Sequence, residues 1–155
     1  MGLKMGSMGS ISKLDGRRAY SLLELLVVLN IIAILASLAY PAYVSYKVRV
    51  NRADVQAQMH QIAARLQQHQ FVYQHFENVT LLQLGYANQF PQQQAAYFDL
   101  ILETKRSSWI LRAHPKENTI QENNGTLALN HLGQSCWEKG QICEPKAQSN
   151  WNNNR

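Results

Sequence analysis

The strongest hydrophobic feature of the chain is an apolar run from Tyr20 to Tyr46 that contains a single charged residue, Glu24. A helix rises 1.5 Å per residue, so Leu22 to Val44 would reach roughly 34 Å, while the hydrocarbon core of a bilayer is about 30 Å thick. The run is therefore predicted to form a helix that can span a membrane. An acid within such a helix usually has a partner and a function, so Glu24 requires an explanation.

Two residues inside this run depart from an ideal membrane helix. Pro41 removes one backbone hydrogen bond, which predicts a kink near the end of the apolar segment. Asn30 can bond to a neighbouring helix or to the carbonyl four residues earlier in its own helix. The sequence leaves both partners of Asn30 open.

Residues 47–77 are predicted to continue the helix as an amphipathic segment. Their apolar side chains recur at spacings of three and four, which places them on one face of a helix. The members of this stripe are Val48, Val55, Met59, Ile62, Leu66, Tyr73 and Phe76. The opposite face is polar and includes Arg52 and several glutamines. We expect this helix to be half membrane anchor and half spine of a globular head.

The rest of the head, residues 78–155, is predicted to be a connector followed by a small antiparallel sheet. Residues 78–96 contain Gly85, Pro91 and a polar run, which indicate an irregular connector. Residues 97–105 and 108–114 alternate apolar and polar side chains, as half-buried strands do, and TLALNHL supplies a third strand. The predicted fold class is α+β, with a three- or four-stranded antiparallel meander covering the helix stripe.

Most of the net positive charge of the chain lies near its N-terminus. The chain has 155 residues, of which 46% are hydrophobic, and a formal net charge of +5. Residues 1–19 hold four basic residues and one acid, so they carry +3 of this charge and leave +2 for the remainder. The overall basicity is therefore no evidence for nucleic-acid binding. Residues 1–19 also lack the apolar core of an ordinary secretory signal peptide.

The basic residues before the apolar run predict a cytoplasmic N-terminus and a head on the opposite side of the membrane. Three further cations, Lys47, Arg49 and Arg52, follow the run directly and weaken this charge bias.

The segment KLDGRRA followed by YSLLELLVVLNIIAILASLAYPAY resembles the N-terminus of type IV pilins and pseudopilins. This resemblance implies that 1–19 is a leader that the prepilin peptidase removes between Ala19 and Tyr20, after which Tyr20 is N-methylated. It also implies that Glu24 and Pro41 occupy the family's glutamate and proline positions. Two departures are visible, because the family normally has Gly and Phe where this chain has Ala19 and Tyr20.

The resemblance further implies a function and its partners. Residues 20–46 would hold the subunit in the bacterial inner membrane with its head in the periplasm, and would later form the filament core of a cell-surface pilus. Glu24 would then neutralise the new amino terminus of Tyr20 on an adjoining subunit. Other pilins and the pilus assembly machinery are the implied partners, and the implied roles are pilus biogenesis, twitching motility, adhesion and DNA uptake.

The C-terminal region, ALN to SNW at Ala128–Trp151, resembles minor pilins of the PilE type, as does RADVQAQM on the helix. The two cysteines, Cys136 and Cys143, lie after the third predicted strand, and in an oxidising periplasm they indicate one disulfide. A zinc site with His114 and His131 is the less favoured alternative. A minor pilin is favoured over an abundant one because the head is small.

Two alternatives come from other functional classes. A DNA-binding receptor pilin of a competence pilus would use a basic patch, and the candidate residues are Lys105, Arg106, Arg112, Lys116, Lys139 and Lys146. Ordinary solvated surface cations explain the same residues. A type II secretion pseudopilin shares the leader and the helix, but the acids here form no calcium-binding cluster. The five histidines show no catalytic spacing, so we expect no enzyme activity, cofactor or metal.

Overall fold

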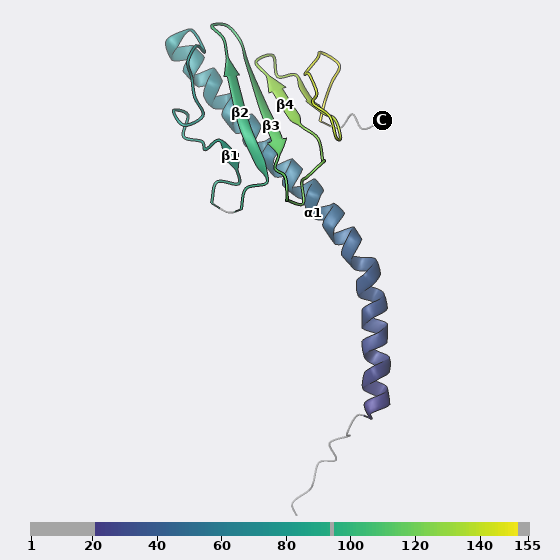
Figure 1. The fold of residues 1–155 in the computed structure, drawn as a ribbon. Helices are drawn as coiled ribbons and strands as arrows, with labels where there is room; N and C mark the ends of the chain where they lie inside the picture. Colours follow the sequence, from purple (N-terminus) through teal and green to yellow (C-terminus); the bar gives the residue numbers. More distant parts are fainter. Residues whose placement is uncertain (1–20, 94, 152–155) are drawn as a thin grey trace, which may run out of the picture. The chain divides into compact units, whose positions relative to one another are not determined.

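The computed structural model describes residues 21–93 and 95–151 (Figure 1). One helix, α1 (Leu22–Tyr73), precedes five strands along the chain. The strands are β1 (Gln89–Phe90), β2 (Phe98–Thr104), β3 (Trp109–Pro115), β4 (Leu127–Asn130) and β5 (Ser135–Trp137). The chain divides into two compact units between Tyr40 and Pro41, so the two units are described separately.

The described part of the first unit is helical from Leu22 to Tyr40, as the apolar run predicts. Ser21 caps the helix, because its Oγ accepts a hydrogen bond of 3.1 Å from the backbone N–H of Glu24. Every side chain from Leu22 to Tyr40 is exposed. Leu22 and Leu38, for example, expose 85% and 70% of their surface.

In the second unit, the sheet is a meander in which each strand is antiparallel to the next, in the order β1-β2-β3-β4-β5. Figure 1 shows the sheet lying along the second half of α1. This arrangement confirms the predicted α+β architecture. The prediction of three or four strands was wrong, because β1 and β5, of two and three residues, extend the meander to five.

The core of the head lies between α1 and one face of the sheet. From the helix, Val55, Met59, Ile62 and Leu66 are fully buried, which confirms the central part of the predicted stripe. The sheet supplies the apolar residues of its inward face, which are Phe98, Leu100, Trp109, Leu111, Ala113, Leu127, Leu129 and Trp137. Burying a side chain of this size contributes about 1.5–3 kcal/mol, so helix and sheet stabilise each other.

The helix ends at Tyr73, before residue 77 where the amphipathic segment was expected to stop. Gln74 has a φ of 61°, a left-handed conformation that ends a helix. Its side-chain amide nitrogen, Nε2, donates a hydrogen bond to Phe71 O at 3.0 Å. As a result Tyr73 points to solvent with 60% exposure, and its placement on the buried stripe was wrong. Phe76 is still buried because the chain turns back towards the sheet, where its N–H bonds to Arg106 O.

Candidate functional site

Glu24, the residue on which the assembly hypothesis depends, lies in the first turn of α1. Ser21 and Glu24 have the spacing of a capping box, in which an N-cap serine is followed three residues later by Glu or Gln. The positive end of the helix dipole also favours an acid in the first turn. Glu24 therefore has a local role in starting the helix, which sequence reasoning missed although the S-x-x-E pattern was readable.

Asn30 and Pro41, the two residues that depart from an ideal membrane helix, both lie within α1. The amide of Asn30 donates to Leu26 O at 2.8 Å, so it bonds within its own helix, which was one of the two alternatives. Pro41 lies inside α1, which continues past it to Tyr73. The kink at Pro41 stays a prediction. The proposed cleavage and methylation residues, Ala19 and Tyr20, lie outside the described residues.

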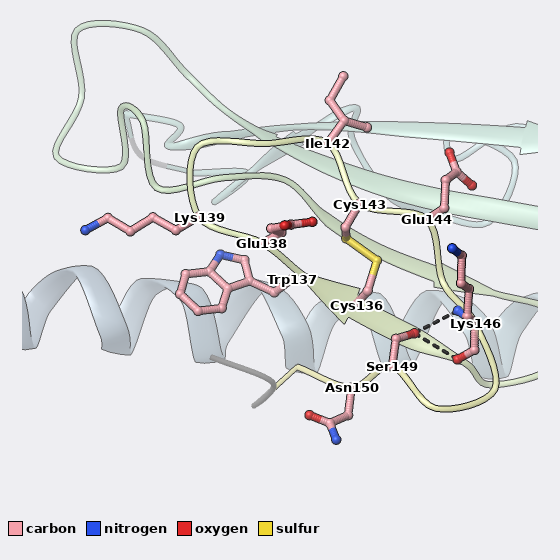
Figure 2. Close-up of a pocket in the computed structure, with 10 residues that line it drawn as sticks. All are labelled: Cys136, Trp137, Glu138, Lys139, Ile142, Cys143, Glu144, Lys146, Ser149 and Asn150. Carbon is pink, nitrogen blue, oxygen red and sulfur yellow. Dashed lines mark hydrogen bonds between the residues drawn. A yellow bond between two sulfur atoms is a disulfide. The ribbon is translucent and has the colours of Figure 1, made fainter. Parts of the chain in front are cut away.

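A disulfide joins Cys136 to Cys143 across 6.1 Å between their Cα atoms, as predicted. Cys136 lies inside β5, so its placement beyond the last strand was wrong. Both cysteines line a pocket with a volume of about 580 Å³, and its lining residues are drawn in Figure 2. The remaining lining residues are Trp137, Glu138, Lys139, Ile142, Glu144, Lys146, Ser149 and Asn150. Two lysines and two glutamates balance each other in this lining.

Buried polar contacts hold the disulfide loop and the β3–β4 connection against the helix. Gln121 is fully buried, and its amide donates to Val48 O of α1 at 3.1 Å. Asn124 donates to the Gln121 side chain at 2.8 Å, and its own carbonyl accepts the indole N–H of Trp137 at 2.8 Å. These bonds connect helix, loop and β5. The segment between β3 and β4 has no hydrophobic periodicity, so its sequence gives no signal of this role.

Gly125 lies where the β3–β4 connection passes closest to the disulfide loop. Its φ is 84°, and a Cβ at this position would overlap the carbonyl oxygen of Glu138. The next residue is also held in place, because Thr126 N bonds to Gln141 O at 3.1 Å. Only glycine fits both the backbone conformation and the space.

Removing the disulfide should destabilise the head moderately. In the chain-entropy model, closing a loop of eight residues is worth about 2.5 kcal/mol. We expect the Cys136→Ser/Cys143→Ser variant to lose about this much free energy of unfolding and to remain folded at room temperature. Denaturant unfolding of the oxidised protein, the reduced protein and the variant measures this loss. An unchanged unfolding midpoint in the variant would contradict the prediction.

The six cations proposed as a DNA-binding patch are dispersed over the head. Arg112 binds Glu103 at 2.7 Å and Glu144 at 2.8 Å, and Lys116 binds Asp99 at 3.0 Å. Lys105 and Arg106 lie in the β2–β3 turn, and the seven residues of β3 separate them from Lys116 by about 20 Å. Lys139 and Lys146 border the disulfide pocket beside Glu138 and Glu144. DNA contact by these residues stays a hypothesis.

Arg52 is placed differently from the sequence prediction. It was assigned to the polar outer face of the helix, but it is half-buried, and its guanidinium carbon lies 3.6 Å from the centroid of the Trp137 ring. Burial, and secondly the charge of Arg49, lower the pKa of Arg52. A cation over an indole face is a favourable contact. Sequence reasoning missed it because the two residues are far apart along the chain.

Two of the five histidines contact each other, because His69 Nδ1 lies 3.2 Å from His75 O and the two ring centroids are 6.3 Å apart. Thr126 Oγ1 lies 3.3 Å from His114 Nδ1, and the Trp151 indole N–H donates to His60 Nε2 at 3.4 Å. Within residues 21–93 and 95–151, no three His, Cys, Asp or Glu side chains form a group that could hold a metal ion. The absence of enzyme activity and of a cofactor stays an expectation.

The chain was compared with protein families, curated proteins and solved structures. No protein family matches the sequence, and no curated protein matches it. Among solved structures, the chain is similar to the non-core minor pilin PilV of Neisseria meningitidis, with 18% identity and a TM-score of 0.49. The similarity covers 67% of this chain and 93% of that chain.

Proposed function

We propose that this chain is a minor-pilin-like subunit of a type IV pilus. The observation that carries the proposal is the division of one 52-residue helix into two environments. Its first half is apolar and long enough to cross a bilayer, and every side chain from Leu22 to Tyr43 is exposed. Its second half buries a stripe from Val55 to Leu66 under an antiparallel sheet. A helix of this kind suits a subunit that is anchored in lipid before assembly and packed against other helices afterwards.

The finer steps belong to the same proposal. The prepilin peptidase removes residues 1–19, and Tyr20 becomes the methylated first residue. Before assembly the subunit crosses the bacterial inner membrane once, with its N-terminus in the cytoplasm and its head in the periplasm. The assembly machinery then moves it into a surface filament with other pilins, where it supports pilus biogenesis, twitching motility, adhesion or DNA uptake.

The site of processing tests this proposal directly. We expect the protein recovered from sheared pili to begin at Tyr20, because cleavage there places Glu24 fifth in the mature chain. N-terminal sequencing and intact mass measure this. The family normally has glycine at the position of Ala19, so Ala19→Gly should speed processing without moving the cut. A mature chain that begins elsewhere, or recovery only with a secretion filament, would contradict the proposal.

A further inference from the structure

Three cations directly after the apolar segment, Lys47, Arg49 and Arg52, have no role in the anchor or the filament core. The structure adds a fourth cation to them from a distant part of the sequence. Arg49 and Lys139 both line a shallow groove with a volume of about 530 Å³. The other residues of this groove are Ser45, Val48, Ile120, Glu122, Asn123 and Asn124. Figure 2 shows Lys139 pointing away from the disulfide, beyond Trp137.

The groove combines positive charge with an apolar surface. Val48 and Ile120 contribute the apolar part, and Ile120 is 40% exposed. The one acid of the groove is Glu122, and its Oε2 accepts a hydrogen bond from Asn118 N at 3.0 Å. The groove is therefore suited to an anion with an apolar part attached.

The cations around the groove are unneutralised. In the part of the chain that the structure describes, the ion pairs use Arg112 and Lys116, and none includes Lys47, Arg49 or Lys139. These three side chains are exposed. Arg52 stacks on Trp137 and faces no acid within ion-pair distance among the same residues. Arg49 and Lys139 line the same groove, and Lys47, Arg49 and Arg52 lie within about 7.5 Å along the helix axis. Such a group of cations favours an anionic partner.

Two exposed tyrosines, Tyr43 and Tyr46, directly precede these cations on α1. Tyr43 and Tyr46 are three residues apart on α1, so they share a face, and they expose 60% and 61% of their surface. Exposed tyrosines at the end of an apolar helix are typical of the boundary between lipid and water. Lys47 follows Tyr46 immediately, and Arg49 lies about 4.5 Å from Tyr46 along the helix axis. The cations thus begin where lipid headgroups would lie.

We propose that Lys47, Arg49, Arg52 and Lys139 form a collar that binds anionic phospholipid headgroups on the outer face of the membrane before assembly. The proposal rests on the proposed function in one respect, because the apolar half of α1 must lie in a bilayer. The groove between Arg49 and Lys139 takes one phosphate, with Val48 and Ile120 against the upper part of the lipid chains. Each cation near such a surface contributes up to about fivefold to binding.

The collar predicts that the full chain in a bilayer prefers anionic over zwitterionic lipids as its immediate neighbours. We would reconstitute the protein in phosphatidylcholine vesicles that contain spin-labelled phosphatidylglycerol or spin-labelled phosphatidylcholine at physiological salt. Electron spin resonance then measures the fraction of each label immobilised by the protein. We expect phosphatidylglycerol to be preferred by at least about threefold. We expect Arg49→Gln/Lys139→Gln to lose most of this preference.

A matched variant controls for the loss of charge. Lys105→Gln/Arg106→Gln also removes two charges, but Arg106 lies next to Phe76, past the end of the helix. Arg49 and Tyr73 are separated by about 36 Å of helix. This variant should keep the preference, as should the charge-retaining Arg49→Lys/Lys139→Arg. Equal loss in the control, loss in the charge-retaining variant, or no preference in the unmodified protein would overturn the collar.

The same experiment separates failure of the collar from failure of the proposed function. If the protein floats with vesicles and immobilises both lipids equally, the anchor stands and only the collar is overturned. If the protein does not float with vesicles, both proposals are overturned. Near-ultraviolet circular dichroism confirms that each variant keeps the native head, which is expected because Arg49 and Lys139 are exposed.

Discussion

Replacing Glu24 with glutamine should leave the subunit in the membrane and reduce its incorporation into pili by at least about tenfold. Every side chain from Leu22 to Tyr43 is exposed, so in the proposed filament this apolar surface would pack against other helices. In that environment the amino terminus of a neighbouring subunit would be a buried charge without a partner, and such charges are costly. Glutamine removes the neutralising charge. Quantitative immunoblotting of membranes and sheared pili measures the ratio.

Glutamine is the informative substitution because of the helix cap. Ser21 Oγ bonds to Glu24 N at 3.1 Å, and glutamine serves as well as glutamate in the third position of a capping box. Glu24→Gln therefore removes the charge and keeps the helix start. Ser21→Ala is the converse control, since it removes the cap and keeps the charge, and it should reduce incorporation much less.

Two results would decide against the counter-ion role of Glu24. One is normal incorporation of Glu24→Gln combined with loss of incorporation in Ser21→Ala, which would make the residue a helix cap only. The other is normal incorporation of Glu24→Lys, which reverses the charge and should be the most defective variant. Loss of membrane insertion in Glu24→Gln would also contradict the expectation, because glutamine costs less in lipid than an ionised acid.

Gly125→Ala should destabilise the head by about 3–5 kcal/mol, because two unfavourable effects coincide. A Cβ at Gly125 would overlap the carbonyl oxygen of Glu138 and lie 2.9 Å from the backbone nitrogen of Gly140. Both neighbours are backbone atoms, so relief requires the disulfide loop to move. The φ of 84° adds the strain of a left-handed conformation. Denaturant unfolding of the full chain in detergent, followed by near-ultraviolet circular dichroism, measures the loss.

Gly133→Ala is the matched control for this prediction. Gly133 also has a positive φ, 75°, but a Cβ there would meet no atom within 4 Å. The control should therefore lose only the conformational part, about 1 kcal/mol. The difference between the two variants isolates the close approach of the two loops. An equal loss of unfolding free energy in both variants would contradict the predicted steric overlap between Gly125→Ala and the disulfide loop.

The main elements could be predicted from the sequence because their patterns are long. The apolar run and the stripe extend over many turns, so the helix was predicted together with its four central buried residues. Strands β2 and β3 have seven residues each, enough to show alternation, and Trp109, Leu111 and Ala113 are buried as expected. The hairpin between these strands closes through Lys105 N and Ser108 O at 2.8 Å.

The remaining features depend on contacts that a linear pattern does not show. Strands β1 and β5 have two and three residues, which is too short for a periodic signal. The dispersion of the cations follows from the meander, which places the β2–β3 turn and Lys116 at opposite ends of the strands. Gln121 is polar and lies in a segment that reads as a loop, yet it is fully buried because α1 offers the carbonyl of Val48 as a partner. Only the folded chain brings that carbonyl near.

Every side chain from Leu22 to Tyr40 is exposed, which would restrict how the proposed subunit moves from the membrane into a pilus. In water this segment would drive aggregation, because a contiguous apolar surface of this length is unfavourable when hydrated. In the proposed function, the subunit would therefore have no stable form in water between membrane and pilus. Transfer from lipid to pilus would be direct, with the receiving helices in place before the apolar segment leaves the lipid.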